Sequence, residues 1–274
     1  MSMERIYISV DIEGIWGNAD SAHTMKEGAA YEQYREHMIW EVNTAIDAWF
    51  ANGAKQVVVN DGHGGMDNLI ASRMDERAEL IIAHGAYKEY GMMEGICSDF
   101  DGACFLGYHC RSNTPGVMAH TIWGSQVRCI HINGEEMGES GINAHLAWYY
   151  GVPLLMVSGD SLLKEQLQEE LETDVQFVET KRTINSLCAQ NCSRLQLKER
   201  YAQATAAALR MRPVIAPKDF YTIDITFHKE RNASFVARVP LTERLDACTV
   251  RIQGSDYDEL YRRMRFLIKI CDAF

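Results

Sequence analysis

The chain has 274 residues, enough for one large domain or two modest ones. Its formal net charge of -11 argues against a general nucleic-acid-binding protein, which would normally present a basic face. No apolar run approaches the ~18 residues of a membrane-spanning helix. A predicted strand begins right after the first five residues, in place of the apolar segment of a secretion signal. We therefore expect a cytoplasmic protein.

Short apolar strands alternate with helical patterns through the first part of the chain. Residues 6–10 are predicted to be the first strand, and residues 34–49 carry apolar side chains at the spacing of an amphipathic helix. Further elements are predicted at the following segments: strands at 55–60, 79–83, 103–108, 127–132 and 153–157, and a helix at 139–148. This alternation indicates an α/β fold, a largely parallel sheet flanked by helices, which we place at residues 1–160.

The second part of the chain, residues 161–274, has a different pattern. An alanine-rich, charged helix is predicted at 193–212 and a closing helix at 256–271. Between them, residues 221–227 and 248–252 alternate with a period of two, as half-exposed antiparallel strands do. We therefore expect a smaller α+β domain with a structural and oligomerising role.

The eight cysteines form no Cys-x-x-Cys cluster, so a structural zinc ribbon is not expected. Cys188 and Cys192 are predicted to lie in a helix or turn, and both are expected to be reduced thiols in a cytosolic chain. The sequence also lacks the glycine-rich loops that bind nucleotides, so a nucleotide-dependent enzyme is unsupported.

Two carboxylates, Asp11 and Glu13, follow the first strand one residue apart. Because side chains alternate along a strand, both can point the same way, and like charges held so close repel unless a cation or a shared proton relieves them. His63 and His109 follow two other predicted strands. The carboxyl ends of parallel strands lie at one edge of a sheet, so these four side chains are predicted to converge on a metal site.

Mixed carboxylate and imidazole ligands suit zinc, with manganese, cobalt or iron less excluded than calcium or magnesium. Four or five such ligands exceed the need of one open catalytic zinc. A carboxylate that bridges two metals ~3.5–4 Å apart would use the surplus. We expect Asp11 to be the bridge and Glu13 to bind a single metal.

Two further residues are ambiguous from the pattern alone. Glu139 opens a predicted helix, where the helix dipole favours a glutamate in the first turn, and the sequence alone favours that interpretation over a ligand role. His120 lies in a turn-rich loop and is either a proton donor or electrostatic stabiliser, or simply an exposed side chain. The remaining histidines lack a strand-end position and are expected to be structural or surface residues: His23, His37, His84, His131, His145 and His228.

Five blocks of the sequence carry a family resemblance: residues 9–15, 59–63, 105–109, 115–120 and 132–139. In order and spacing they resemble the zinc-dependent D-aminopeptidases of the bacterial dipeptide-transport operon. The resemblance covers the first half of the chain closely and the second half more loosely. Trp16 and Gly62 depart from the family's usual residues, and an indole near the site could change the substrate.

The resemblance implies a two-zinc hydrolase that removes N-terminal D-amino acids from short peptides. It also implies a homo-oligomer, described for the family as a ring-stacked decamer whose sites face an internal chamber. It assigns metal binding to five residues: Asp11, Glu13, His63, His109 and Glu139. It assigns catalysis to His120. For Glu139 the resemblance thus favours a ligand role over the helix-dipole interpretation.

We therefore expect peptide-bond hydrolysis by a water that the metals activate. In this reaction His120 would stabilise the developing oxyanion or protonate the leaving amine. Family accounts have treated this histidine as a nucleophile, and the sequence leaves these roles open. Two alternative functions remain, a metal-dependent amidase acting on another small amide and a non-catalytic metal-binding oligomer.

Overall fold

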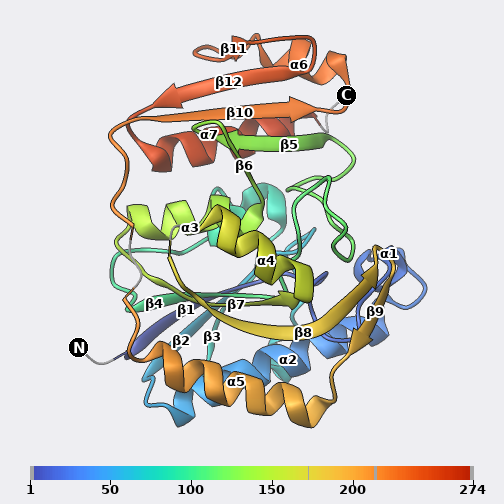
Figure 1. Cartoon of the computed structure of the whole chain (residues 1–274), viewed down its shortest axis with the longest axis vertical. Helices are drawn as coiled ribbons and strands as arrows, with labels where there is room; N and C mark the ends of the chain where they lie inside the picture. Colours follow the sequence, from blue (N-terminus) through green and yellow to red (C-terminus); the bar gives the residue numbers. More distant parts are fainter. Residues whose placement is uncertain (1–2, 172, 213–214, 272–274) are drawn as a thin grey trace.

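The computed structural model describes residues 3–171, 173–212 and 215–271 and contains two β-sheets (Figure 1). The larger sheet is parallel except for its edge strand β9, which runs antiparallel to β8. Its strands lie in this order: β3 (Glu79–Ile81), β2 (Gln56–Asp61), β1 (Arg5–Val10), β4 (Gly102–Leu106), β7 (Leu154–Asp160), β8 (Gln176–Asn185) and β9 (Cys188–Asn191). Strand β1 is therefore an interior strand, with β2 and β4 on its two sides.

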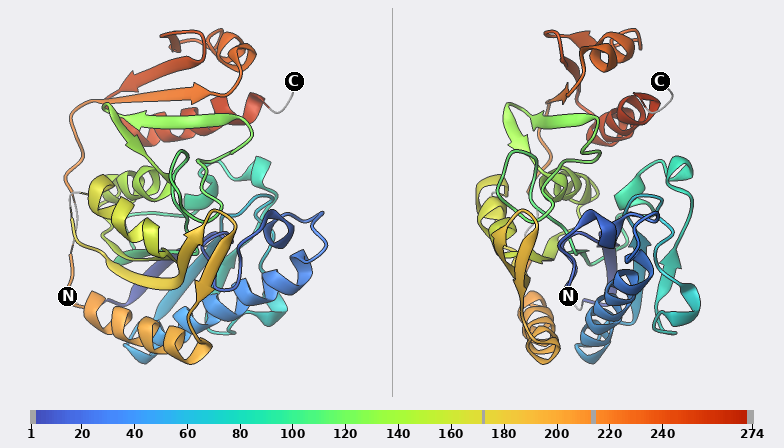
Figure 2. Two further views of the ribbon diagram at one scale, coloured as in Figure 1. Left: turned by 45° about the vertical axis from the view of Figure 1, so that its right-hand side comes forward. Right: turned by 90° about the vertical axis from the view of Figure 1, so that its right-hand side faces the viewer.

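Helices cover both faces of the larger sheet (Figures 1 and 2). One face carries α2 (Tyr31–Ala51) and α5 (Arg194–Ala208), and the other carries α3 (Glu139–Tyr149) and α4 (Ser161–Glu170). Ile6 and Ile8 of β1 pack with α2, whereas Tyr7 belongs to the apolar cluster that includes α3. Since both faces are covered, residues 6–10 of β1 are all buried, and this explains why they are apolar apart from Ser9.

The smaller sheet is antiparallel and lies on the far side of α3 (Figure 1). Its strands lie in this order: β11 (Glu243–Arg244), β12 (Thr249–Gly254), β10 (Tyr221–Phe227), β5 (Val127–Ile132) and β6 (Glu135–Met137). Helix α7 (Tyr257–Ile270) contacts β10, β12 and α3, so it joins this sheet to the rest of the core. The remaining elements are short: α1 (Ser21–Thr24), η1 (Ala71–Arg73), η2 (Gly85–Tyr87), η3 (Gly91–Met93) and α6 (Glu230–Val236).

The predicted fold class, a largely parallel sheet flanked by helices with a smaller α+β portion, is confirmed. Residues 127–132 were expected in the first sheet domain, but they form β5 of the antiparallel sheet and pair with β10. The two sheets do not divide at residue 160, because β8 and β9 complete the larger sheet. The partner of a strand is set by pairing over long distances in the chain, which a local pattern does not encode.

The segment around Cys188 is also different from the prediction of a helix or turn. Cys188 begins β9, the second strand of a hairpin with β8, and Cys192 follows its end. All eight cysteines are free thiols. Across the residues that the structure describes, every helix is too short or too polar to traverse a bilayer.

Two glycines allow the loop after β1 to lie directly against the end of β4. A Cβ on Gly14 would lie 1.9 Å from Tyr108 O, and a Cβ on Gly107 would lie 2.3 Å from Asp11 O. Gly107 has a φ of +69°, and its carbonyl accepts a hydrogen bond of 2.7 Å from Gly14 N. Only glycine permits so close a backbone approach, and this contact fixes the spacing between the two strand ends.

We predict that Gly14→Ala lowers the free energy of unfolding by about 3 kcal/mol, because the new methyl group collides with backbone atoms that cannot rotate away. Urea unfolding followed by circular dichroism measures this quantity. Gly254→Ala is the matched control, since a Cβ there meets no atom closer than 3.8 Å. Equal stability of the two variants would contradict the role given to Gly14.

Candidate metal centre

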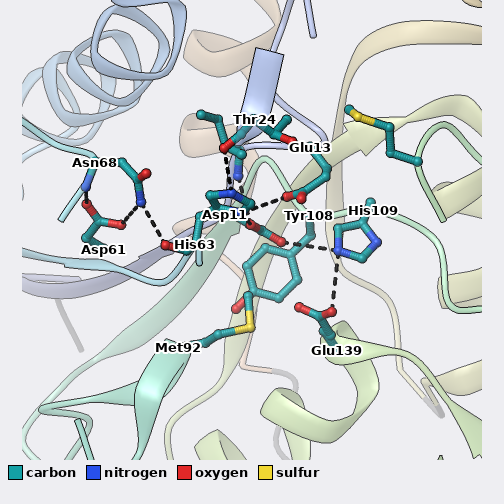
Figure 3. Close-up of polar contacts among 12 residues, drawn as sticks. Asp11, Glu13, Thr24, Asp61, His63, Asn68, Met92, Tyr108, His109 and Glu139 are labelled. Atoms are coloured by element: carbon teal, nitrogen blue, oxygen red, sulfur yellow. Dashed lines mark hydrogen bonds and ion pairs between the residues drawn. The ribbon is translucent and has the colours of Figure 1, made fainter. Parts of the chain in front are cut away.

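The candidate site lies at the carboxyl ends of three neighbouring strands, β2, β1 and β4 (Figure 3). Asp11 follows β1 directly, His63 lies two residues beyond β2, and His109 lies three residues beyond β4. These strands are neighbours and parallel, so their ends meet at one edge of the sheet. Glu13 lies in the same loop as Asp11. The structure thus brings together the four side chains whose convergence the sequence predicts.

The first group of possible metal ligands consists of Asp11, Glu13 and His63, all buried. His63 Nδ1 lies 3.0 Å from Asp11 Oδ1 and 3.0 Å from Glu13 Oε2. One ligand atom from each residue lies within 4.8 Å of the others. These distances are short enough for one cation to be shared among the three.

The second group consists of His109, His120 and Glu139. Glu139 Oε1 lies 3.4 Å from His109 Nε2 and 3.9 Å from His120 Nε2, and the two imidazole rings stack with centroids 4.2 Å apart. Glu139 is the first residue of α3, but its carboxylate accepts from Ile122 N at 2.7 Å and so faces the His120 loop. The sequence-only interpretation of Glu139 as a helix-dipole residue therefore misses the direction of its side chain.

Asp11 connects the two groups. Its Oδ1 faces His63, and its Oδ2 lies 3.3 Å from His109 Nε2. The two oxygens of one carboxylate thus face a histidine from each group. Neither group includes any of the six histidines expected to be structural or surface residues, among the residues that the structure describes.

Each of the three histidines is oriented by a main-chain carbonyl. Thr24 O lies 3.0 Å from His63 Nε2, Cys110 O lies 2.9 Å from His109 Nδ1, and Met118 O lies 2.9 Å from His120 Nδ1. A carbonyl can only accept, so these nitrogens carry the hydrogen, and the other ring nitrogen of each neutral imidazole is free to bind a metal or a proton. No sequence signal identifies Thr24, because every residue type offers the same carbonyl.

Charge within the site lowers the pKa of Asp11 and raises the pKa values of His63 and His109. Burial alone would raise the pKa of Asp11, but hydrogen bonds with His109 and His63 outweigh it and hold the pKa of this carboxyl well below its ordinary value. Burial disfavours the charged form of both histidines, yet nearby carboxylates raise their pKa values well above the ordinary value, led by Glu13 for His63 and by Glu139 for His109. In the metal-free protein, protons therefore supply the positive charge that balances the carboxylates.

The residues fit a metal. Glu13 Oε2 and His109 Nε2 are buried, and neither forms a hydrogen bond of good geometry with any residue in the described part of the chain. Buried polar atoms without such a partner are costly, and a bound cation would satisfy both. Carboxylate oxygens and imidazole nitrogens are the ligands that zinc takes in catalytic sites.

Trp16, which departs from the family's usual residue, is held beside the site loop. Its indole Nε1 donates to Cys192 O at 2.7 Å, and its ring packs edge-on against His37 and Trp40 of α2. The ring is therefore anchored between α2 and the residue after β9. Gly62 is explained by space, because a Cβ there would lie 2.8 Å from Val10 O.

Clustered carboxylates and imidazoles at this edge of an α/β sheet are typical of metal-dependent hydrolases. Residues 4–266 match a family model described as D-aminopeptidase, and the chain belongs to this family. It is 36% identical over 271 residues to a D-aminopeptidase of Bacillus subtilis (strain 168), and the match covers 97% of each chain. The predicted family and class of peptide-hydrolysing enzyme are thereby confirmed.

The fold is also similar to a solved structure, the Zn-dependent D-aminopeptidase DppA from Bacillus subtilis, described as a self-compartmentalizing protease. The TM-score is 0.91 and the sequence identity 34%, and the match covers 97% of each chain. The similarity includes both sheets, because it extends over nearly the whole length.

We predict that zinc binding to the metal-free protein releases protons at neutral pH. The raised pKa values of His63 and His109 keep these rings protonated, and a metal can bind only the deprotonated nitrogen. Zinc affinity should therefore increase as the pH rises toward those pKa values. Calorimetric titration in buffers of different ionisation enthalpy measures the protons released, and an enthalpy independent of the buffer would contradict the prediction.

Proposed function

We propose that the protein is a zinc-dependent aminopeptidase that removes N-terminal D-amino acids from short peptides. The observation that carries this proposal is the convergence of three carboxylates and three imidazoles on one edge of the sheet. Its similarity to the Zn-dependent D-aminopeptidase DppA supports both the metal and the substrate class.

We propose two zinc ions per subunit. Glu13 and His63 would hold one ion, His109 and Glu139 the other, and Asp11 would bridge them, because its two oxygens face a histidine of each group. Bound zinc supplies a Lewis acid that polarises the peptide carbonyl and lowers the pKa of water. The net acidity of the protein draws in the cationic amino end of a peptide.

His120 is the proposed catalytic residue, and its exposure supports a role different from that of the ligands. Its side chain is 27% exposed, against 1% for His109, so a substrate can reach it. Met118 O orients the ring and leaves Nε2 on the side of Glu139. From this position His120 would donate a proton from Nε2 to the leaving amine or stabilise the developing oxyanion.

We further propose that the protein forms a homo-oligomer, with a decamer and an internal chamber as the expected form. The DppA structure is described as self-compartmentalizing, and this chain matches it over 97% of its length. Light scattering on the purified protein would test the assembly, and a monomer at micromolar concentration would contradict it. The cytoplasmic location expected from the sequence stays a prediction.

We predict that His120→Ala lowers kcat on a D-alanyl peptide by about 100-fold or more, the usual contribution of a general acid. The zinc content should stay unchanged, because the ligands assigned to the two ions are intact. His228→Ala is the matched control, since this histidine is exposed and lies beyond β10. Full turnover by His120→Ala would show that this residue takes no part in the reaction.

Parallel assays with D- and L-aminoacyl amides separate this function from a general amidase. The proposal requires D-aminoacyl substrates to be hydrolysed faster, whereas an amidase with another substrate would show no such preference. Stoichiometric zinc without turnover across a broad amide panel would indicate a non-catalytic metal-binding protein.

We predict that the two carboxylates of the first loop differ in their effect on zinc content. The wild-type protein should bind two ions per chain, Glu13→Gln about one, and Asp11→Asn fewer than one, because only Asp11 faces both groups. Elemental analysis by mass spectrometry counts the ions. Asp99→Asn, at a residue whose side chain is 73% exposed, is the control. Equal zinc loss in Asp11→Asn and Glu13→Gln would contradict the bridging role.

A further inference from the structure

Lys181 of β8 is buried, and its ammonium group is surrounded by main-chain carbonyls of the loop that follows β1. Nζ donates to Glu13 O, to Ile15 O at 2.9 Å and to Asn18 O at 2.6 Å. An ammonium has three N–H donors, so these bonds use all of them. The carboxylates of Asp160, Glu41 and Glu13 act on this ammonium electrostatically, whereas its hydrogen bonds go to the carbonyls of the loop.

Thr180 binds a fourth carbonyl of the same loop. Its hydroxyl donates to Gly14 O at 2.6 Å. Thr180 and Lys181 are consecutive, yet both contact the same loop, whereas successive side chains of a regular strand point to opposite faces. The pairing of β8 with β7 shifts here, from Gly159 opposite Glu179 to Asp160 opposite Lys181, so Thr180 is an extra residue. Such a bulge redirects side chains, and here both reach residues 13–18.

These contacts matter because the loop has few other ways to hold its carbonyls. Two of its amides donate outside the loop, Gly14 N to Gly107 O and Trp16 N to Glu41 Oε2. A buried carbonyl without a donor costs about as much as a lost hydrogen bond. Removal of the Lys181 ammonium would leave Glu13 O and Asn18 O to find new donors, whereas Ile15 O keeps its bond from Asn18 N. The backbone of Glu13 would shift as a result.

We propose that Lys181, assisted by Thr180, is a positioning residue that holds the Glu13 backbone so that the Glu13 carboxylate faces His63. The inference rests on the proposed function in taking Glu13 and His63 as ligands of one zinc ion. The lysine touches neither substrate nor metal. It acts through the main chain of the loop, as outer groups around metal sites act through the ligands that they orient.

The test is a zinc titration of the metal-free protein against a chromogenic chelator, together with kcat and KM on a D-alanyl peptide. Lys181→Met keeps the length of the side chain and removes its donors. It should weaken the binding of one zinc ion by about 10-fold or more and leave the other unchanged. The variant should have a lower kcat with little change in KM, and its kcat should recover when zinc is added in excess.

A second pair of variants keeps the test decisive where Lys181→Met does not fold. Thr180→Val and Thr205→Val each remove a buried hydroxyl that donates to a main-chain carbonyl, but Thr205 lies in α5 and bonds to Tyr201 O. Only Thr180→Val should weaken zinc binding, although both should lower the melting temperature.

Two outcomes would overturn the inference. Zinc affinity and kcat equal to wild type in Lys181→Met, or equal changes in both threonine variants, would show that Lys181 and Thr180 stabilise the fold without positioning Glu13. The titration of the wild-type protein is separate, because absence of zinc binding there would overturn the proposed function and this inference together.

Discussion

Repulsion among buried carboxylates is the constraint on which the site depends. Asp11, Glu13 and Glu139 lie within one cluster of ligands and histidines, away from solvent. Two like charges 4 Å apart cost about 4 kcal/mol at an effective dielectric constant of 20. The histidines relieve this repulsion when they are protonated, and a divalent cation would relieve it further. The three carboxylates at this edge of the sheet therefore require nearby positive charge in order to stay close together.

Much of the site could be predicted because three of its candidate ligands obey a simple topological rule. Asp11, His63 and His109 each follow a strand with a clear apolar pattern, and parallel strands place their carboxyl ends together. Glu139 could not be predicted in this way. It is reached only after the chain has passed through the β5–β6 hairpin, and the pairing of that hairpin with β10 depends on residues far along the chain.

The supporting contacts were beyond prediction for a different reason. Thr24 orients His63 through a main-chain carbonyl, and Lys181 holds the Glu13 loop through carbonyls as well. A carbonyl is common to all residues, so its position depends on the path of the backbone and not on the residue type. The family resemblance implied the proposed roles of Glu139 and His120, and the structure adds the contacts of Glu139 with His109 and with the His120 loop.

The position of β5 has a consequence for when the site can form. Asp11, Glu13 and His63 are carried by early strands of the larger sheet, whereas His120 and Glu139 flank the hairpin that pairs with β10. That hairpin lacks its neighbour until residues 221–227 have been synthesised. Pairing over such a separation is slow compared with local contacts. The proposed catalytic centre is thus expected to stay incomplete until this strand has been made.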